Sequence, residues 1–374
     1  MKLVIDTNIV HEDFTLRGAR ISKLCSASPR LGYDLMIPEV VCDEIINQYR
    51  KKLISNLSGY YSVVKMMDEI KSETKTTFDR DAFVTKTISE YTSYLYTRLK
   101  TIGINVIPYP IVDVKKLVNK DLYLKKPFKE VKEETVGFRD SLIWESVKSV
   151  CTPSRMLLED PQVVFLTENT RDFADSNNEL HPELITELRD SHLPENCVLL
   201  IPDVDAFFRE KVDVELEELD NIRTALLKLG KYNRLNLQQL LKERLNDSFY
   251  EEYLFKIDTA SRRFVHLPSY CEDPSINLIF DPVIDDISVR RLSDQKVLIE
   301  ANANAWVDIF FFIFAPDYDL LDSNRKPTII DDQLNEYYYL VESSVNVQLS
   351  VTIQASAKIG KVLSSDIRIT NVVI

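Results

Sequence analysis

The first half of the chain alternates short apolar runs with longer segments of helical periodicity. The apolar runs lie at 3–5, 104–107, 163–166 and 197–201, and the helical segments include 38–53 and 138–151. The runs have the length of buried strands, whereas the longer segments repeat apolar residues on one helix face. Pro38 suits the first turn of a helix. Short buried strands that alternate with helices predict an α/β domain with a mostly parallel sheet over residues 1–202.

The pattern changes after residue 202. Residues 204–230 and 236–255 have helical periodicity, and Gly230 suits the end of the first of these helices. We therefore expect a helical connector over 203–268.

From residue 269 the chain is rich in β-branched and aromatic residues, which is typical of strands. Such residues fill the segments 306–314, 336–356 and 366–374. Apolar residues alternate with polar ones between 345 and 353, which predicts a strand with one buried face. We expect an antiparallel, β-rich domain over 269–374.

Composition narrows the class of protein. The 374 residues are 45% hydrophobic and 28% charged, as in globular proteins. There is no apolar run long enough to span a membrane, and the N-terminus does not resemble an export signal. The five cysteines show no paired spacing. These features predict a cytoplasmic protein with reduced thiols and no membrane partner.

The formal net charge of −13 argues against broad, nonspecific binding of nucleic acid, which requires lysine and arginine on the phosphates. It leaves open a local basic groove, or a site where metal cations supply the positive charge.

Four acidic residues occupy comparable places in the predicted α/β domain. Two of them, Asp6 and Asp172, follow predicted strands, while Glu44 and Asp140 lie on helices beside the sheet. Each has a structural alternative: a helix cap, a solvated helix acid, a charge on a helix dipole or a turn former. Because ligands of open α/β sheets bind beyond the carboxyl ends of the strands, all four can lie on one rim.

Four converging carboxylates repel one another unless cations lie between them. Mg²⁺ and Mn²⁺ prefer carboxylate oxygens, water and phosphate as ligands. Asn8 and Asn169 can add neutral contacts without further charge. The acids therefore predict a site for Mg²⁺ or Mn²⁺.

Four motifs surround these acids in order along the chain: IDTN at 5–8, EVVCDEI at 39–45, GFRDSLIW at 137–144 and FLTENTRDF at 165–173. Together they resemble the motifs of the PIN-domain ribonucleases. The likeness is to a bacterial PIN-like branch formerly catalogued as a domain of unknown function. That branch also has a KPF-type stretch, seen here as KKPFKE at 125–130.

The resemblance implies that Asp6, Glu44, Asp140 and Asp172 are metal-binding and catalytic, with Asn8 and Asn169 supporting them. If Asn169 takes the place of the family's fourth acid, Asp172 lies outside the ligand set. Family members hold one or two divalent ions and hydrolyse phosphodiester bonds, usually in RNA.

The segment 113–132 carries seven lysines, with Tyr123 and Phe128 among them. It is either a flap over the substrate, with lysines on phosphates and an aromatic ring on a base, or a solvated surface helix. Arg139 either reaches phosphate or pairs with an acid. The candidates for substrate binding are Lys125, Lys126, Phe128 and Arg139.

The main hypothesis is a metal-dependent endoribonuclease, and the resemblance also suggests a toxin or anti-phage effector. The alternatives are a metal-dependent DNase and a non-catalytic scaffold with a residual acidic site. The β-rich domain is a candidate surface for a regulatory or inhibitory protein, or for a homo-oligomer.

Overall fold

The computed structural model describes residues 1–70, 79–153, 161–249, 257–258, 263–264, 270–293, 295–323, 326–333 and 336–373. They form two compact units, Met1–Glu215 and Leu216–Ile374. The three-part division with a connector over 203–268 stays a prediction, and part of that connector lies outside the described residues.

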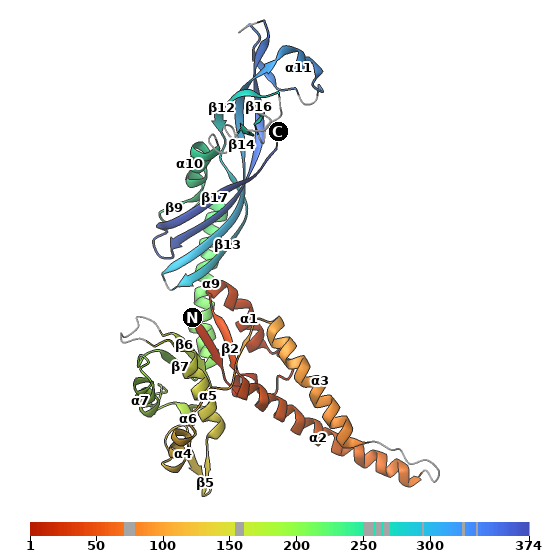
Figure 1. Cartoon of the computed structure of the whole chain (residues 1–374), viewed down its shortest axis with the longest axis vertical. Helices are drawn as coiled ribbons and strands as arrows, with labels where there is room; N and C mark the ends of the chain where they lie inside the picture. The colour runs from red at the N-terminus through yellow and green to blue at the C-terminus, as the bar shows by residue number, and fades with distance from the viewer. Residues whose placement is uncertain are drawn as a thin grey trace. The chain divides into compact units, whose positions relative to one another are not determined.

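The first unit is built on a parallel sheet of five strands (Figure 1). Its order is β3 (Asn105–Ile107), β2 (Asp34–Pro38), β1 (Lys2–Ile5), β6 (Val163–Leu166) and β7 (Val198–Ile201). The central strands β1 and β6 are interior because they are continuous apolar runs, and Leu3 to Ile5 are fully buried. Pro38 ends β2, so the helix predicted from residue 38 begins one residue later.

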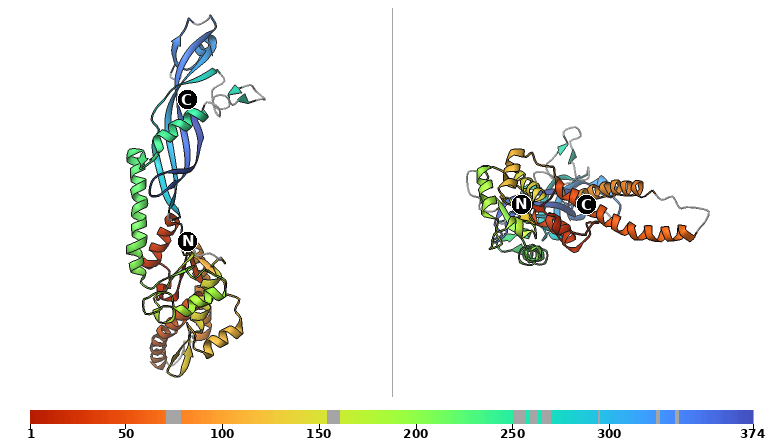
Figure 2. Two further views of the ribbon diagram at one scale, coloured as in Figure 1. Left: turned by 90° about the vertical axis from the view of Figure 1, so that its left-hand side faces the viewer. Right: turned by 90° about the horizontal axis from the view of Figure 1, so that it is seen from below.

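Helices surround this sheet. They are η1 (Thr7–Val10), α1 (Ala19–Leu31), α2 (Glu39–Ile70), α3 (Arg80–Thr101), α4 (Val114–Leu122), α5 (Phe138–Ser149), α6 (Thr170–Phe173), α7 (Pro182–Asp190), α8 (Val204–Phe207) and the π-helical turn η2 (Phe208–Val212). A short hairpin, β4 (Lys129–Val131) and β5 (Glu134–Val136), precedes α5. Helices α2 and α3 pack side by side and project together from the sheet (Figure 2). Their contact includes the stacked rings of Tyr49 and Tyr91, whose centroids are 3.9 Å apart.

Helix α9 (Asp213–Leu229) begins in the first unit and continues into the second. In the second unit it is followed by β8 (Lys231–Tyr232), β9 (Leu235–Asn236), α10 (Leu237–Phe249), β10 (Ile257–Asp258) and β11 (Arg263–Phe264). Gly230 ends α9 with a φ of 65°, a conformation that favours glycine.

An antiparallel sheet of six strands fills most of the second unit. Its strands are β12 (Glu272–Ile279), β13 (Val283–Ser293), β14 (Lys296–Phe314), β15 (Thr328–Asp331), β16 (Tyr338–Ser356) and β17 (Val362–Val373), with α11 (Ala315–Leu320) after β14. The two central strands, β14 and β16, pair from Lys296 with Ser356 to Phe314 with Tyr338. The alternating residues of β16 predicted to share one face, Val345 to Ile353, are buried.

The predicted fold class, a parallel α/β sheet followed by an antiparallel β-rich domain, is confirmed. In the described part of the chain, no helix is long and apolar enough to cross a membrane.

Candidate active site at the carboxyl ends of the parallel strands

Asp6 lies where strand β1 ends. Because Ile5 pairs with Leu166, the next residues of the two strands, Asp6 and Thr167, are neighbours at the rim of the sheet. Thr167 Oγ1 donates to Asp6 Oδ2 at 2.5 Å, and the Thr7 backbone N–H donates to Asp6 Oδ1 at 2.6 Å. Asp6 also caps the N-terminus of η1. The same carboxylate therefore caps a helix, as one alternative predicted, and lies at the rim of the sheet. Only 3% of its surface is exposed.

Asn8 connects the same two strand ends. Its Nδ2 lies 3.2 Å from both Asp6 Oδ2 and Thr167 Oγ1, and its Oδ1 accepts the Glu168 backbone N–H at 3.2 Å. Asn8 thereby fixes the loops that follow β1 and β6.

Glu44 reaches the rim from α2, which leaves the sheet directly after β2. Thr7 Oγ1 donates to Glu44 Oε2, and Arg139 NH1 lies 2.7 Å from Glu44 Oε1. Glu44 is therefore not a solvated helix acid, since 14% of its side chain is exposed. Of the two alternatives for Arg139, this structure has the one that pairs with an acid.

Asp140 lies in the first turn of α5, which packs against α2 and β2. Asn169 Nδ2 donates to Asp140 Oδ1 at 3.0 Å. The Asn169 backbone N–H donates to Thr167 Oγ1 at 3.0 Å, and this hydroxyl in turn donates to Asp6, so Asn169 links the Asp6 and Asp140 contacts.

Asp172, on α6, is held by a lysine. Lys129 Nζ donates to its two carboxylate oxygens at 2.5 and 2.7 Å. The Asp172 side chain is 4% exposed and Lys129 is 31% exposed. Asp172 thus has a cationic partner, as Glu44 has in Arg139, while Asn169 contacts Asp140 directly.

Burial and mutual repulsion perturb two of these acids. Burial raises the pKa of Asp6 to about 7, with hydrogen bonds from Thr167 and Thr7 opposing it and the charges of Asp140 and Glu44 adding to it. Burial also raises the pKa of Asp140 to about 6, with further contributions from Asp172 and Glu44, while Lys129 and Arg139 oppose the rise. Asp6 and Asp140 are therefore close enough to other carboxylates for repulsion to raise their pKa values, and for Asp140 the charges of Lys129 and Arg139 do not cancel this rise.

The donor set fits a hard divalent cation in kind, because it consists of carboxylate oxygens with an amide beside them. Asp6, Glu44, Asp140 and either Asn169 or Asp172 would hold it. As they lie, no three acidic, histidine or cysteine side chains among the described residues form a ready ligand group. The contacts explain this arrangement, since Glu44 faces Thr7 and Arg139 while Asp172 faces Lys129.

These pKa shifts predict a pH-dependent stability. Between pH 3.8 and about pH 7, Asp6 is protonated in the folded protein but ionised in the unfolded protein. The metal-free protein therefore loses stability as the pH rises through this range. We expect its melting temperature to fall from about pH 5 to about pH 8, and to fall less in Asp6→Asn. Mn²⁺ should raise the melting temperature more at the higher pH. Equal pH dependence in the two proteins, measured by calorimetry, would contradict this account.

Gly137 positions the start of α5. Its φ is 123°, and a Cβ there would lie 2.6 Å from the carbonyl oxygen of Pro127 and 2.8 Å from Phe128 Cα. Only glycine lets α5 begin this close to the segment that carries Lys129.

We expect Gly137→Ala to destabilise the protein by about 2 kcal/mol or more, because both the backbone conformation and the contact become strained. Thermal unfolding measures this. Gly103→Ala is the matched control, since Gly103 also has a positive φ, 75°, but its Cβ would meet nothing within 4 Å. Equal losses in the two variants would show that close contact at Gly137 is unimportant.

The predicted substrate-binding residues have different environments. Lys125 is exposed, whereas Lys126 donates from Nζ to the Arg171 carbonyl at 2.6 Å and from its backbone N–H to Glu183 Oε2 at 2.8 Å. Phe128, a candidate for substrate binding, is not available to stack on a base, because its side chain is buried with 3% exposed and belongs to the core. The exposed aromatic residue of this segment is Tyr123, at 72%.

Sequence reasoning missed three residues that organise the cluster: Thr7, Thr167 and Lys129 as the partner of Asp172. Thr7 and Thr167 stand inside the motifs already quoted, Thr7 directly after Asp6 and Thr167 two positions before Asn169. That position was the available signal for a hydroxyl that orients a carboxylate.

Comparison with known families gives a match to a PIN-domain model. The model of the PIN domain matches residues 3–173, which include all four acids, Asn8 and Asn169. No match was found among curated proteins or among solved structures.

Proposed function

Residues 3–173 belong to the PIN-domain family of nucleases, and from this premise we propose that the chain is a metal-dependent endoribonuclease. The observation that carries the proposal is the cluster of buried Asp6 with half-buried Glu44 and Asp140, in which burial and mutual repulsion raise the pKa of two carboxyl groups. A nuclease can use such a cluster to hold a divalent cation, which would offset the negative charge of a phosphodiester.

Each residue has a role in this proposal. Asp6, Glu44 and Asp140 hold Mg²⁺ or Mn²⁺, and Asn169 orients Asp140 through its amide. Asn8, Thr7 and Thr167 hold the carboxylates in place. When bound, the divalent ion supplies the charge that lowers the pKa of the attacking water and offsets charge on the departing oxygen.

Arg139 and Lys129 neutralise Glu44 and Asp172 in the metal-free protein. Arg139, which is 66% exposed, is placed to turn from Glu44 to a phosphate of the substrate. Asp172 holds Lys129 at the edge of the cluster.

The test is cleavage of labelled single-stranded RNA, folded RNA, single-stranded DNA and duplex DNA in Mg²⁺. Cutting of RNA alone supports the proposal, whereas cutting of DNA alone identifies the DNase alternative. A free ribonuclease endangers its host, so the proposal includes a toxin or anti-phage role, tested by growth arrest on expression that Asp140→Asn abolishes. Binding of a regulatory protein or a second copy by the β-rich unit stays a prediction.

A further inference from the structure

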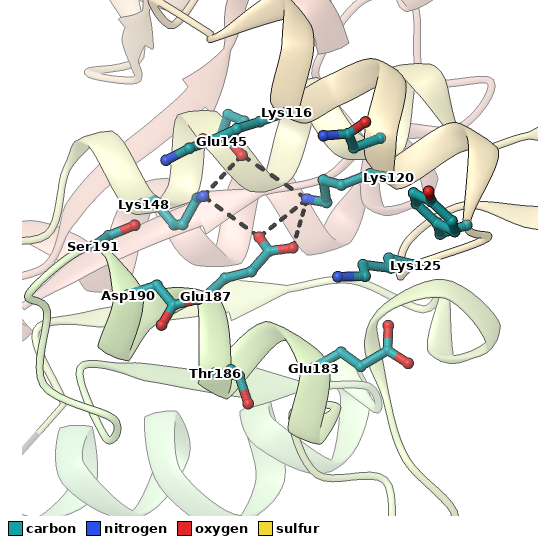
Figure 3. Close-up of a pocket in the computed structure, with 12 residues that line it drawn as sticks. Lys116, Lys120, Lys125, Glu145, Lys148, Glu183, Thr186, Glu187, Asp190 and Ser191 are labelled. Atoms are coloured by element: carbon teal, nitrogen blue, oxygen red, sulfur yellow. Dashed lines mark hydrogen bonds and ion pairs between the residues drawn. The ribbon is translucent and has the colours of Figure 1, made fainter.

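The first unit contains a cavity of about 570 Å³ outside the acid cluster. Its lining comes from α4, α5, α7 and the segment after α4 (Figure 3). None of the four motif acids lines it.

Four charged side chains form a closed network at this cavity. Lys120 Nζ lies 2.8 Å from Glu187 Oε1, and Lys148 Nζ lies 2.8 Å from Glu145 Oε1. Lys120 Nζ is also 3.9 Å from Glu145 Oε1, and Lys148 Nζ is 3.4 Å from Glu187 Oε2. Figure 3 shows the four groups in a ring, with Lys116 and Lys125 outside it. The ring neutralises itself, and Lys120 and Lys148 are therefore not available for phosphate.

Lys116 and Lys125 remain available. Both are exposed, and their amines make no ion pair or hydrogen bond with any residue that the structure describes. Tyr123, between them in the sequence, also lines the cavity and has 72% of its surface exposed. Glu183 and Asp190 add hydrogen-bond acceptors. Amines for a phosphate, an aromatic ring for stacking and carboxylates for the amino groups of a base match one nucleotide better than a simple anion.

The cavity is joined to the acid cluster by one short segment. Lys125 lines the cavity, Lys126 contacts both Glu183 of the cavity and the carbonyl of Arg171, and Lys129 binds Asp172. The Cα atoms of Lys125 and Lys129 are at most about 14 Å apart, because four residue steps join them. The cavity and the acid cluster are therefore near enough for neighbouring nucleotides of one strand to reach both.

We propose that this cavity binds a nucleotide of the substrate strand a short distance from the bond that is cut. Lys116 and Lys125 bind its phosphates, Tyr123 stacks on its base, and Glu183 and Asp190 face the edge of the base. The inference rests on the proposed nuclease function and deepens it, because it assigns a site that the single-stranded form of the substrate can enter.

The experiment measures binding of a fluorescein-labelled single-stranded RNA to full-length protein in the Asp140→Asn background, without divalent metal, over a range of salt concentrations. We expect Lys116→Ala with Lys125→Ala to reduce the slope of log K against log salt by about 1.4, since each phosphate contact contributes about 0.7. We expect Tyr123→Ala to weaken binding about 10-fold, while Tyr123→Phe retains it because the stacking ring remains.

Lys86→Ala with Lys100→Ala is the matched control. It removes the same charge from two exposed positions on α3. Lys100 lies just before β3 begins, at the rim of the sheet opposite to the one that carries the acids. An equal loss of slope in this control would overturn the cavity proposal, as would unchanged binding by the cavity variants.

Cleavage by the wild type separates the two proposals. Metal-dependent RNA cleavage with unchanged binding by the cavity variants overturns the cavity and leaves the nuclease. Absence of both RNA binding and cleavage overturns the nuclease, and the cavity proposal with it.

Discussion

Asp140→Asn is expected to lower the rate of RNA cleavage by about 10³-fold, because it removes a negative charge where the divalent cation is held. The amide has nearly the same size as the carboxyl group and retains an oxygen for Asn169 Nδ2, now 3.0 Å from Asp140 Oδ1. The substitution also relieves repulsion with Asp172 and Glu44, so the melting temperature should stay the same or rise. Activity and stability should therefore change independently.

Single-turnover cleavage of labelled RNA measures this effect. Asp81→Asn is the matched control, because both acids lie in the first turn of a helix, Asp81 in α3 and Asp140 in α5. Unlike Asp140, Asp81 is exposed and lies outside the acid cluster. Full activity of Asp140→Asn, or an equal loss in Asp81→Asn, would refute the role of Asp140.

Glu187→Ala is expected to destabilise the first unit by about 3 kcal/mol, because it leaves buried charge without its partner. Glu187 accepts from Lys120 and Lys148 and from Trp144 Nε1, the last at 2.9 Å. Trp144 is fully buried, and the Lys120 side chain is 10% exposed. The remaining Glu145 lies 3.9 Å from Lys120, too far for a hydrogen bond.

Denaturant unfolding measures this loss. Glu187→Gln is the comparison, since it keeps an acceptor for Trp144 and should cost less than Glu187→Ala. Glu183→Ala is a second control on the same helix, because Glu183 accepts one exposed hydrogen bond, from the Lys126 backbone. A Glu187→Ala protein as stable as Glu183→Ala would show that the network contributes nothing.

Local patterns were enough to predict the two sheets and the rim that carries the acids. Strand β1 is a continuous apolar run that ends in Asp6, and the alternation from Val345 to Ile353 defined a buried face. Strand β2 was not predicted, because it has only three apolar residues before Pro38 and Pro38 was assigned to the next helix. The length of α2 was underestimated, since apolar residues of its outer half, such as Val63 and Met66, are exposed rather than packed in a core.

Side-chain contacts between residues far apart in the sequence could not be predicted from local patterns. Lys129 was one of seven lysines in a charged segment, and only the fold brings it to Asp172, 43 positions away. Phe128 resembled an exposed aromatic because its neighbours are lysines, yet Gly137 draws its backbone against α5. The pairing of Lys120 with Glu187 likewise depends on α4 and α7 meeting.

Two of the four acids have cationic partners in the metal-free protein, Glu44 with Arg139 and Asp172 with Lys129. A divalent ion has to compete with the Arg139 contact when it binds Glu44. The dependence of activity on metal concentration therefore tests the cluster as a whole.

The most direct measurement is the single-turnover rate of single-stranded RNA cleavage by the wild type across a titration of Mn²⁺, with EDTA as the zero point. The carboxylate cluster predicts a rate that rises with Mn²⁺, reaches a plateau and disappears in EDTA. A rate that is undiminished in EDTA, or no cleavage at any Mn²⁺ concentration by folded protein, would contradict a metal-dependent ribonuclease.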